Sequence, residues 1–343
     1  MVERIDIKEF LNRVHNLPVI DVRSPAEFHQ GHIPGAINLP LFDNEERAIV
    51  GTIYKNSGRD AAVLKGLELV GPKLAGFIKK LHQLAPQREI LVHCWRGGMR
   101  SEHMSWLFDQ AGFRTALLDG GYKSYRKFIR QSFFNDAKIV VIGGFTGSGK
   151  TDILHQLAIS GEQALDLEML ACHKGSVFGA LGQGAQPTNE QFENNIYQQW
   201  QAFNQKKRIW IEDESRSLGS VIIPDPLFEQ MSRAPLIVLE ISKDDRIRRL
   251  VKEYAEFDKA FLRDALLKIS EKFGGTRMKE ALEALEKNDF YQVTKLVLNY
   301  YDKAYLHAVS RRINKDVIHH KLKEDEPEMN AKSVLKVIQE IAE

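Results

Sequence analysis

The sequence predicts an α/β protein of two domains, each built on a mostly parallel sheet, with a helical region toward the C-terminus. Three observations lead to this expectation. The 343 residues suffice for about two domains, and 43% are hydrophobic, enough for more than one core. Short apolar segments alternate with helix-like segments, which favours parallel strands joined by helices. Two glycine-containing loops directly follow apolar segments, so each is expected at the carboxyl edge of a sheet, where ligands of such folds bind.

The N-terminal domain is expected over residues 1–130, and its elements follow in chain order. The segment 18–22 is a buried strand, and Ser24 followed by Pro25 begins a helix because the two residues provide a cap and a first-turn proline. The turn at 31–36 leads into the next strand. Further strands are expected at 37–39, 89–93 and 115–118, and helices at 71–84 and 101–111.

The second domain is expected over residues 131–343 and begins with the strand 138–142. The pattern from 244 to 312 is almost wholly helical, interrupted at Gly274 and Gly275. Two more strands are expected at 208–211 and 235–240; the tail contains a short strand near 317, a loop at 324–328 and a last helix from about 331.

Composition excludes several classes of protein. No apolar run approaches the ~18 residues of a membrane span, and the first residues, MVERIDIKEF, have no secretory h-region. Two cysteines, Cys94 and Cys172, form neither a disulfide framework nor a four-thiolate zinc site. We therefore expect a reducing, cytoplasmic location and no membrane partner. The histidines, His32, His93 and His173 included, have no metal-site spacing, so no metal site is predicted.

The net charge of +2 does not by itself indicate a nucleic-acid partner. Positive charge gathers instead in residues 121–130, which carry four basic residues and no acidic one. Their spacing of i, i+3, i+4 and i+7 places them on one helical face. That face is either a solvated side of a connecting helix or a contact for a phosphate backbone between the two domains. The four residues are Lys123, Arg126, Lys127 and Arg130.

The loop of residues 93–101, HCWRGGMRS, lies between an expected strand and an expected helix. Amide groups of a glycine-containing loop at a helix N-terminus form an anion-binding nest around the Cys94 thiol. Arg96 and Arg100 lie nearby and favour the thiolate. A thiolate in such a nest attacks or carries the electrophilic atom of a tetrahedral anion or a chalcogen. The alternative is a buried structural cysteine.

The first hundred residues resemble rhodanese domains. The resemblance rests on residues 21–28, DVRSPAEF, on 31–38, GHIPGAIN, and on Cys94, which stands where such domains hold a persulfide-forming cysteine. One feature departs from that family, because the five residues between Cys94 and Arg100 make the loop one longer than usual. His-Cys-x5-Arg-Ser is also the signature of cysteine phosphatases, for which Asp119 is the candidate general acid. A wider loop suits phosphate or selenophosphate better than a single sulfur atom.

The segment 144–151, GFTGSGKT, matches the phosphate-binding P-loop without a mismatch and stands between an expected strand and helix. The glycines let backbone amides approach phosphate oxygens, Lys150 bridges terminal phosphates, and the Thr151 hydroxyl is placed to reach Mg²⁺ if that ion is bound. The motif indicates a di- or triphosphate but does not identify a nucleotide. The expected phosphate-binding residues are Gly144, Gly147, Ser148, Gly149, Lys150 and Thr151.

Acidic residues follow the strand that ends at Ile211. Glu212 stands where P-loop enzymes have the carboxylate that orients Mg²⁺ through water, and its alternative is a solvated strand end. Glu214 is a further supporting acid. Arg216 either neutralises a leaving phosphate or pairs with one of these two carboxylates.

The order of the two domains resembles the tRNA 2-selenouridine synthase family over roughly residues 5–305. The resemblance implies that wobble 2-thiouridine of tRNA is S-alkylated with geranyl diphosphate and that selenium from selenophosphate then replaces the geranylthio group. It implies that Cys94 carries selenium as S-selanylcysteine. Because the pyrophosphate released in the first step needs an anion-binding loop, we predict that the P-loop holds geranyl diphosphate and that ATP is not required. Further matching segments are 166–168, 173–176, 178–179, 186–193 and 212–216 with Gly219.

Three function classes remain open from the residues alone: a selenium transferase acting on tRNA, a cysteine phosphatase fused to a kinase-like module, and a nucleotide-gated RNA-binding protein. Three tyrosines in the helical region are either base-stacking or, more commonly, core residues. They are Tyr300, Tyr301 and Tyr305, and other candidate phosphate contacts are Lys206, Lys207, Arg208, Arg246, Arg248, Arg249, Arg311 and Arg312.

Overall fold

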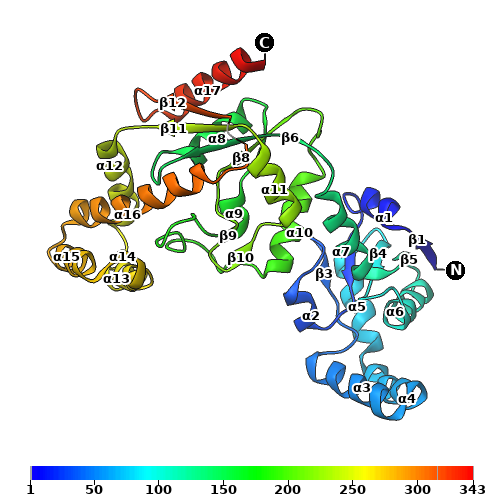
Figure 1. The fold of residues 1–343 in the computed structure, drawn as a ribbon. Coiled ribbons are helices and arrows are strands. Elements are labelled where there is room, and N and C mark those ends of the chain that lie inside the picture. The colour runs from blue at the N-terminus through cyan, green and yellow to red at the C-terminus, as the bar shows by residue number, and fades with distance from the viewer. Residues whose placement is uncertain (1, 315, 343) are drawn as a thin grey trace. The chain divides into compact units, whose positions relative to one another are not determined.

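The computed structural model describes residues 2–314 and 316–342, which divide into two compact units (Figure 1). Unit 1 runs to Ser132 and unit 2 starts at Phe133, whereas the sequence placed the division at residue 130. Each unit contains its own parallel five-stranded sheet, so the predicted α/β class is confirmed. No helix in the described parts of the chain is both long and apolar enough to cross a bilayer.

Unit 1 has the strand order β1-β5-β4-β2-β3, and every pair is parallel. The central β4, which ends immediately before Cys94, is buried along nearly its whole length. The sequence analysis missed β1 because its three residues include only one that is buried. The strands are β1 (Glu3–Ile5), β2 (Val19–Asp21), β3 (Ile37–Asn38), β4 (Glu89–His93) and β5 (Arg114–Leu118).

Seven helices complete unit 1 among its described residues. The predicted cap at Ser24 is present, because its side chain accepts from the Glu27 amide while Glu27 bonds back to the Ser24 amide. The helix expected at 71–84 begins instead with a 3₁₀ turn, Gly71–Lys73. The helices are α1 (Ile7–Arg13), α2 (Pro25–Gln30), α3 (Asn44–Ser57), α4 (Arg59–Val70), α5 (Leu74–Leu84), α6 (Met99–Gln110) and α7 (Gly121–Ser132).

The helices α3 and α4 form a hairpin between β3 and β4 that the sequence analysis did not predict. Asp43 caps α3 in a reciprocal arrangement with Glu46, and Gly58, with φ of +87°, reverses the chain between the two helices. Neither helix has a clear apolar stripe, because α3 buries no residue and α4 only Ala62 and Gly66. The hairpin therefore gives little of the periodic signal from which helices are read.

Unit 2 has the strand order β12-β11-β6-β8-β7, again parallel throughout. Its central strand β6 leads directly into the glycine loop and is buried from its second residue onward. The strands are β6 (Lys138–Gly144), β7 (Gln163–Leu165), β8 (Arg208–Glu212), β11 (Leu236–Glu240) and β12 (Val317–Lys321), and a separate antiparallel pair joins β9 (Ser217–Leu218) to β10 (Val221–Ile222).

Two buried clusters contain many of the helices of unit 2, and a smaller one joins Ile247 and Leu250 of α12 to Leu298 of α16. Of the two larger clusters, one packs α8 and α17 on the sheet, and the other is formed largely by α13 to α16 around Phe273 and Leu285. The last helix begins at Pro327, inside the loop expected at 324–328, because proline is accommodated in a first helical turn. The helices are α8 (Lys150–Ile159), α9 (Leu167–Ala171), α10 (Asn189–Trp200), α11 (Asp225–Arg233), α12 (Lys243–Tyr254), α13 (Lys259–Leu267), α14 (Ser270–Phe273), α15 (Gly275–Glu286), α16 (Phe290–Ser310) and α17 (Pro327–Ala342).

Candidate active sites

The Cys94 loop joins β4 to α6 at the carboxyl edge of the unit 1 sheet. The Cys94 Sγ lies 3.1 Å from the Ser101 Oγ, which is placed to donate to a thiolate. The start of α7 fixes the loop, since the Tyr122 and Lys123 amides donate to the carbonyls of Cys94 and Trp95 at 2.8 and 2.9 Å. The thiol is thus held at a helix N-terminus, as the sequence predicts.

Two glycines make this packing possible. Gly97 has φ of +66°, and a Cβ there would lie 2.6 Å from the Leu118 carbonyl oxygen. Gly121 has φ of +59°, and a Cβ there would lie 2.5 Å from the Cys94 carbonyl oxygen. Any side chain at either position would push the cysteine loop away from α7.

A buried ion pair between Asp21 and Arg23 packs against Tyr122, at the start of the helix that holds the Cys94 loop. Asp21 and Arg23 are both fully buried, and their side chains are joined by hydrogen bonds of 2.6 to 3.0 Å. The Arg23 guanidinium also lies 3.8 Å from the centre of the Tyr122 ring. Burial raises the pKa of the Asp21 carboxyl, but His93 and Arg23 outweigh this effect and hold it below its ordinary value. The DVR sequence is therefore a structural support for the loop.

Replacing Arg23 with Met should destabilise unit 1 strongly, because the substitution leaves the Asp21 carboxylate buried without its main partner. We expect the free energy of unfolding to fall by about 3–5 kcal/mol. Urea and thermal unfolding of the full chain would measure it. Arg114→Met is the matched control, since Arg114 pairs with Glu89 at the surface and should cost about 0–1 kcal/mol. Equal losses for the two variants would contradict this role.

Contrary to the expectation from the sequence, the two arginines of the loop do not both surround the thiol. The Arg100 guanidinium is held by Glu27 through bonds of 2.6 and 3.1 Å, so its charge is shared with a carboxylate instead of being directed at Sγ alone. Arg96 is exposed. Asp119, the candidate acid of a phosphatase, is also exposed and pairs with Arg4 at 3.7 Å. Asp119 is not among the residues that line the cavity bordered by Cys94, so this candidate acid is not placed for phosphatase chemistry.

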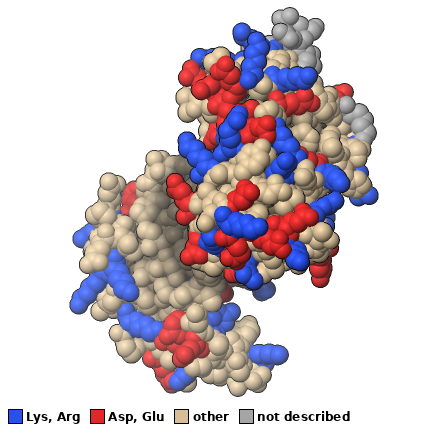
Figure 2. Space-filling view, turned by 90° about the vertical axis from the view of Figure 1, so that its left-hand side faces the viewer, with Lys and Arg blue, Asp and Glu red and all other residues tan. Residues whose placement is uncertain are grey.

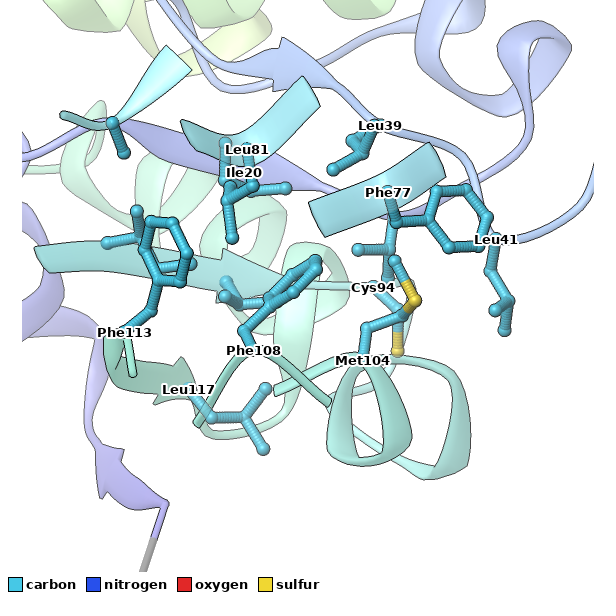
Figure 3. Close-up of a cluster of buried hydrophobic side chains, with 14 of the residues drawn as sticks. Ile20, Leu39, Leu41, Phe77, Leu81, Cys94, Met104, Phe108, Phe113 and Leu117 are labelled. Carbon is cyan, nitrogen blue, oxygen red and sulfur yellow. The ribbon is translucent and has the colours of Figure 1, made fainter. Parts of the chain in front are cut away.

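The Cys94 side chain is only 3% exposed and belongs to the hydrophobic core of unit 1. Figure 3 shows it beside Met104, Phe77 and Leu41. It nevertheless borders a cavity of about 1190 Å³, the Cys94 cavity, whose walls also include Arg96 and Arg100. The thiol is thus accessible to a ligand in an environment more apolar than the sequence indicated.

The phosphate loop connects β6 to α8 in unit 2, as predicted. Gly144, Gly147 and Gly149 have φ of +154°, +80° and +79°, which leave the loop backbone in a conformation that other residues rarely adopt. A Cβ on Gly144 would lie 2.5 Å from the Ser148 Oγ. That buried hydroxyl has no hydrogen-bond partner among the described residues. Arg246, on α12, donates to the Thr146 carbonyl at 3.3 Å and steadies the loop.

Lys150, at the start of α8, faces carboxylates where a phosphate is expected. Its Nζ is 3.0 Å from Glu168 Oε1 and also binds Glu214, and the Thr151 hydroxyl donates to Glu168 at 3.1 Å. Burial lowers the pKa of Lys150, but these carboxylates and Glu212 outweigh it and hold the pKa well above its usual value. Lys150 therefore stays charged, and an incoming anion must displace its carboxylate partners.

Glu168 is a site residue that sequence reasoning did not single out. It lies on α9, and only the fold brings it to Lys150 and Thr151. With Glu212 and Glu214 it forms what we call the acidic cluster. The only feature of the sequence that pointed to Glu168 was the family resemblance of segment 166–168. That resemblance did not indicate that Glu168 would contact Lys150 or Thr151.

Glu212 lies among the carboxylates around Lys150 and is not the solvated strand end considered as its alternative, whereas Arg216 takes neither of the two carboxylate partners considered for it. Glu212 is fully buried, and one of its oxygens accepts from the Glu168 amide at 2.7 Å. Burial, together with Asp166 and Glu168, raises its pKa well above the usual value, so it is not a solvent-facing carboxylate. Arg216 contacts neither Glu212 nor Glu214, because it pairs with Asp225 at 2.5 Å on the surface.

Glu214 should make diphosphate binding depend on pH. Burial raises the pKa of Glu214 to about 8, although Lys150 opposes this shift. Below that pH the Glu214 side chain is largely neutral. Above it, the carboxylate repels an incoming anion and holds the Lys150 ammonium group in their ion pair. We expect pyrophosphate affinity to fall as pH rises past 8, by up to about tenfold per pH unit. Calorimetric titration at pH 7 to 9.5 measures this.

The Glu214→Gln variant is the control for that titration, because it removes the contribution of the protein and leaves the ionisation of pyrophosphate itself. Its affinity should exceed that of the wild type at the highest pH, and its pH profile should be flatter. Coinciding profiles for the two proteins would show that Glu214 does not face the bound anion.

The basic segment forms part of α7, as predicted. Tyr122, Tyr125 and Ile129 are its buried side. Of the four basic residues, Lys123, Lys127 and Arg130 are exposed, whereas Arg126 is half-buried. On the face seen in Figure 2, Lys and Arg are interspersed with Asp and Glu. A role of these side chains in tRNA binding stays a prediction.

Several other residues that were candidates for RNA contacts instead bind or pack against neighbouring residues of unit 2. Arg246 is buried and pairs with Asp302 at 2.8 Å, and Arg312 pairs with Asp213 at 2.9 Å. Tyr301 accepts a hydrogen bond from the Val177 amide at 2.6 Å. Tyr300 and Tyr305 pack against Phe273 and Phe145. These side chains make their contacts within unit 2. For the three tyrosines, this agrees with the interpretation that they are packing residues.

Within residues 2–314 and 316–342, no group of three or more His, Cys, Asp or Glu side chains is arranged to hold a metal ion. The Thr151 hydroxyl, considered for Mg²⁺, is bonded to Glu168.

The fold and the two loops define a fusion of a rhodanese-like domain with a P-loop domain. The Rhodanese-like domain family matches residues 6–128, and the tRNA 2-selenouridine synthase AAA domain family matches 137–332. The chain belongs to the tRNA 2-selenouridine synthase family and is an enzyme. Among its curated relatives of that name, that of Nitrosomonas europaea is 34% identical, covering 87% of this chain and 91% of the relative. That of Bordetella petrii is 35% identical, with coverage of 87% and 88%.

Proposed function

We propose that this enzyme converts wobble 2-thiouridine of tRNA to 2-selenouridine in two steps, with geranyl diphosphate and selenophosphate as co-substrates. The relatives are named for tRNA 2-selenouridine synthesis. The observation that supports the proposal is the presence of two different glycine-containing loops between strand and helix in one chain, of which one contains a thiol and the other the P-loop lysine. Two such loops suit two reactions with two different phosphorus-containing anions.

In the first step, the sulfur on C2 of the uracil attacks C1 of geranyl diphosphate. The new C–S bond forms as the C–O bond breaks, pyrophosphate leaves with the electron pair, and the base loses its N3 proton to solvent as C2 becomes doubly bonded to N3. Amides of the Gly144–Thr151 loop and Lys150 stabilise the charge that develops on the leaving oxygen. ATP is not needed, because the diphosphate is already part of the substrate. Alkylation prepares the base for exchange, since a thiol leaves carbon more readily than a sulfide anion.

In the second step, selenium replaces the geranylthio group. Overall, a C2–Se bond forms, the C2–S bond breaks, water takes the phosphoryl group of selenophosphate, and geranylthiol leaves with a proton. This exchange is redox-neutral. Cys94 releases the selenium: its Sγ takes the phosphoryl group of selenophosphate, the P–Se bond breaks, selenide leaves beside C2, and water then hydrolyses the P–S bond. The S-selanylcysteine that the family resemblance implies would need a two-electron oxidant that neither co-substrate supplies, so the exchange proceeds here without it. The amides at the start of α6 and the Ser101 hydroxyl, 3.1 Å away, are the groups that stabilise an anionic Sγ.

Reconstitution with purified protein and a 2-thiouridine anticodon stem-loop tests the proposal. With geranyl diphosphate alone, S-geranyl-2-thiouridine should accumulate; later addition of selenophosphate should convert it to 2-selenouridine, as followed by nucleoside mass spectrometry. Selenium incorporation that proceeds equally well without geranyl diphosphate would rule out the geranylated intermediate.

A further inference from the structure

We propose that the Cys94 cavity binds the geranyl chain of S-geranyl-2-thiouridine while selenium is exchanged at C2. This inference rests on the proposed function and assigns the chain a place in unit 1. The geranyl chain therefore lies beside Cys94 during the second step. This holds whichever residues bind the diphosphate during the first step.

The position of the cavity carries the first part of the argument. Every lining residue belongs to unit 1, between Ala26 and Leu107, and Cys94 is one of them. The breaking C2–S bond must lie within reach of the selenium that Cys94 releases, so the chain attached to that sulfur must extend from the same place. The cavity that Cys94 borders gives it room. Its volume of about 1190 Å³ is somewhat above the ~300–1,000 Å³ of common small-molecule sites, enough for a ten-carbon chain together with a base.

The walls of the cavity carry the second part. The α3–α4 hairpin contributes Val50, Tyr54, Val63 and Leu67, and α6 contributes Trp106. These are predominantly apolar side chains, as an isoprenoid chain requires. The two helices bury only Ala62 and Gly66 completely, and Val50, Leu69 and Val70 pack partly against the core of unit 1. Tyr54 and Leu67, which line the cavity, stay largely exposed and are available to a ligand.

Large apolar side chains are exposed on the side of the hairpin that faces the cavity. Tyr54, Leu67 and Trp106 are 60%, 61% and 60% exposed, and all three line the cavity. Clustered exposed apolar surface of this kind commonly marks a binding site. A bound geranyl chain would cover these side chains, and its affinity would increase with each apolar group that it removes from water.

The charges at the cavity identify an anionic amphiphile as the occupant, in preference to a neutral lipid or an apolar helix. The lining includes four guanidinium groups and one carboxylate, that of Glu27, which is bonded to Arg100. Guanidinium groups bind phosphates well, so an apolar chain attached to a nucleotide of RNA matches both halves of the lining. The four are Arg47, Arg59, Arg96 and Arg100.

The test compares two stem-loop RNAs that differ only at sulfur, one carrying S-geranyl-2-thiouridine and the other S-methyl-2-thiouridine. Each is incubated with selenophosphate and the full-length protein, and formation of 2-selenouridine is followed. The wild type should convert the geranyl RNA with at least about tenfold higher kcat/KM, because only the long chain gains from apolar burial. Leu67→Lys should remove most of that preference, because it lowers kcat/KM on the geranyl RNA far more than on the methyl RNA.

Leu64→Lys is the matched control. Leu64 lies on the same helix and is 62% exposed, but it does not line the cavity, so its variant should keep the wild-type preference. Thermal unfolding of both variants verifies that each is folded. A wild type without preference, or a Leu67→Lys variant that keeps it, would overturn the inference and leave the two-step function standing. A wild type that converts neither RNA would instead overturn the proposed function.

Discussion

Replacing Cys94 with Ser should abolish selenium incorporation and leave geranylation intact. The hydroxyl of serine is not a good nucleophile at neutral pH. We expect conversion of S-geranyl-2-thiouridine to fall by more than about a thousandfold, as when other enzymes lose their nucleophile. Geranylation of 2-thiouridine, which uses the P-loop, should proceed at nearly the wild-type rate. Nucleoside mass spectrometry of the same RNA reports both products.

The second cysteine provides the control. Cys172 ends α9 in unit 2 and takes no part in the Cys94 loop, so Cys172→Ser should retain both reactions. The assignment of selenium chemistry to Cys94 would be wrong if the Cys94→Ser variant still formed 2-selenouridine. It would be incomplete if that variant, although folded, also lost geranylation, because the thiol would then serve the first step as well.

Replacing Lys150 with Ala should have the opposite effect. Removing this ammonium group takes away the main positive charge at the P-loop and leaves the acidic cluster unneutralised. We expect geranylation to fall by about 10²–10³-fold, the range typical of losing one oxyanion-stabilising group. Selenium exchange on RNA that already carries the geranyl group should continue, because that step depends on unit 1.

Two measurements separate this effect from misfolding. Lys332→Ala, which removes a surface lysine that pairs with Glu328, should keep both activities. Circular dichroism and thermal unfolding should show that unit 2 of the Lys150→Ala variant remains folded, because unpaired buried carboxylates in the cluster take up protons. A folded Lys150→Ala variant that geranylates at the wild-type rate would remove the P-loop from the first step.

The sequence was sufficient for the parts of the fold that depend on local pattern. Strand 89–93 coincides with β4, and the glycine loops at Cys94 and Gly144 lie between strand and helix as expected. Apolar runs, a capping serine and positive-φ glycines each produce a signal within a few residues. For the same reason, the parallel sheets and the two-loop organisation could be read without a structure.

Features that depend on tertiary contacts could not be read in this way. Glu168 approaches Lys150 only through the placement of α9, and Arg100 meets Glu27 from α2. The pairing of Arg216 with Glu212 or Glu214, one of the two alternatives read from the sequence, is wrong because Arg216 pairs with Asp225 at the surface. The α3–α4 hairpin gave no periodic pattern, because many of its apolar side chains line a cavity and only a few pack against a core. The sequence therefore gave no indication of an apolar site beside the thiol.

Mixing the two active-site variants tests most directly the claim that one chain carries separate sites for successive steps. With 2-thiouridine RNA in excess over protein, and both co-substrates present, neither Cys94→Ser nor Lys150→Ala should form 2-selenouridine alone. An equimolar mixture should form it, because one variant geranylates the RNA and the other exchanges selenium. If both variants are folded and the mixture forms none, the two loops do not serve separable steps on the same base.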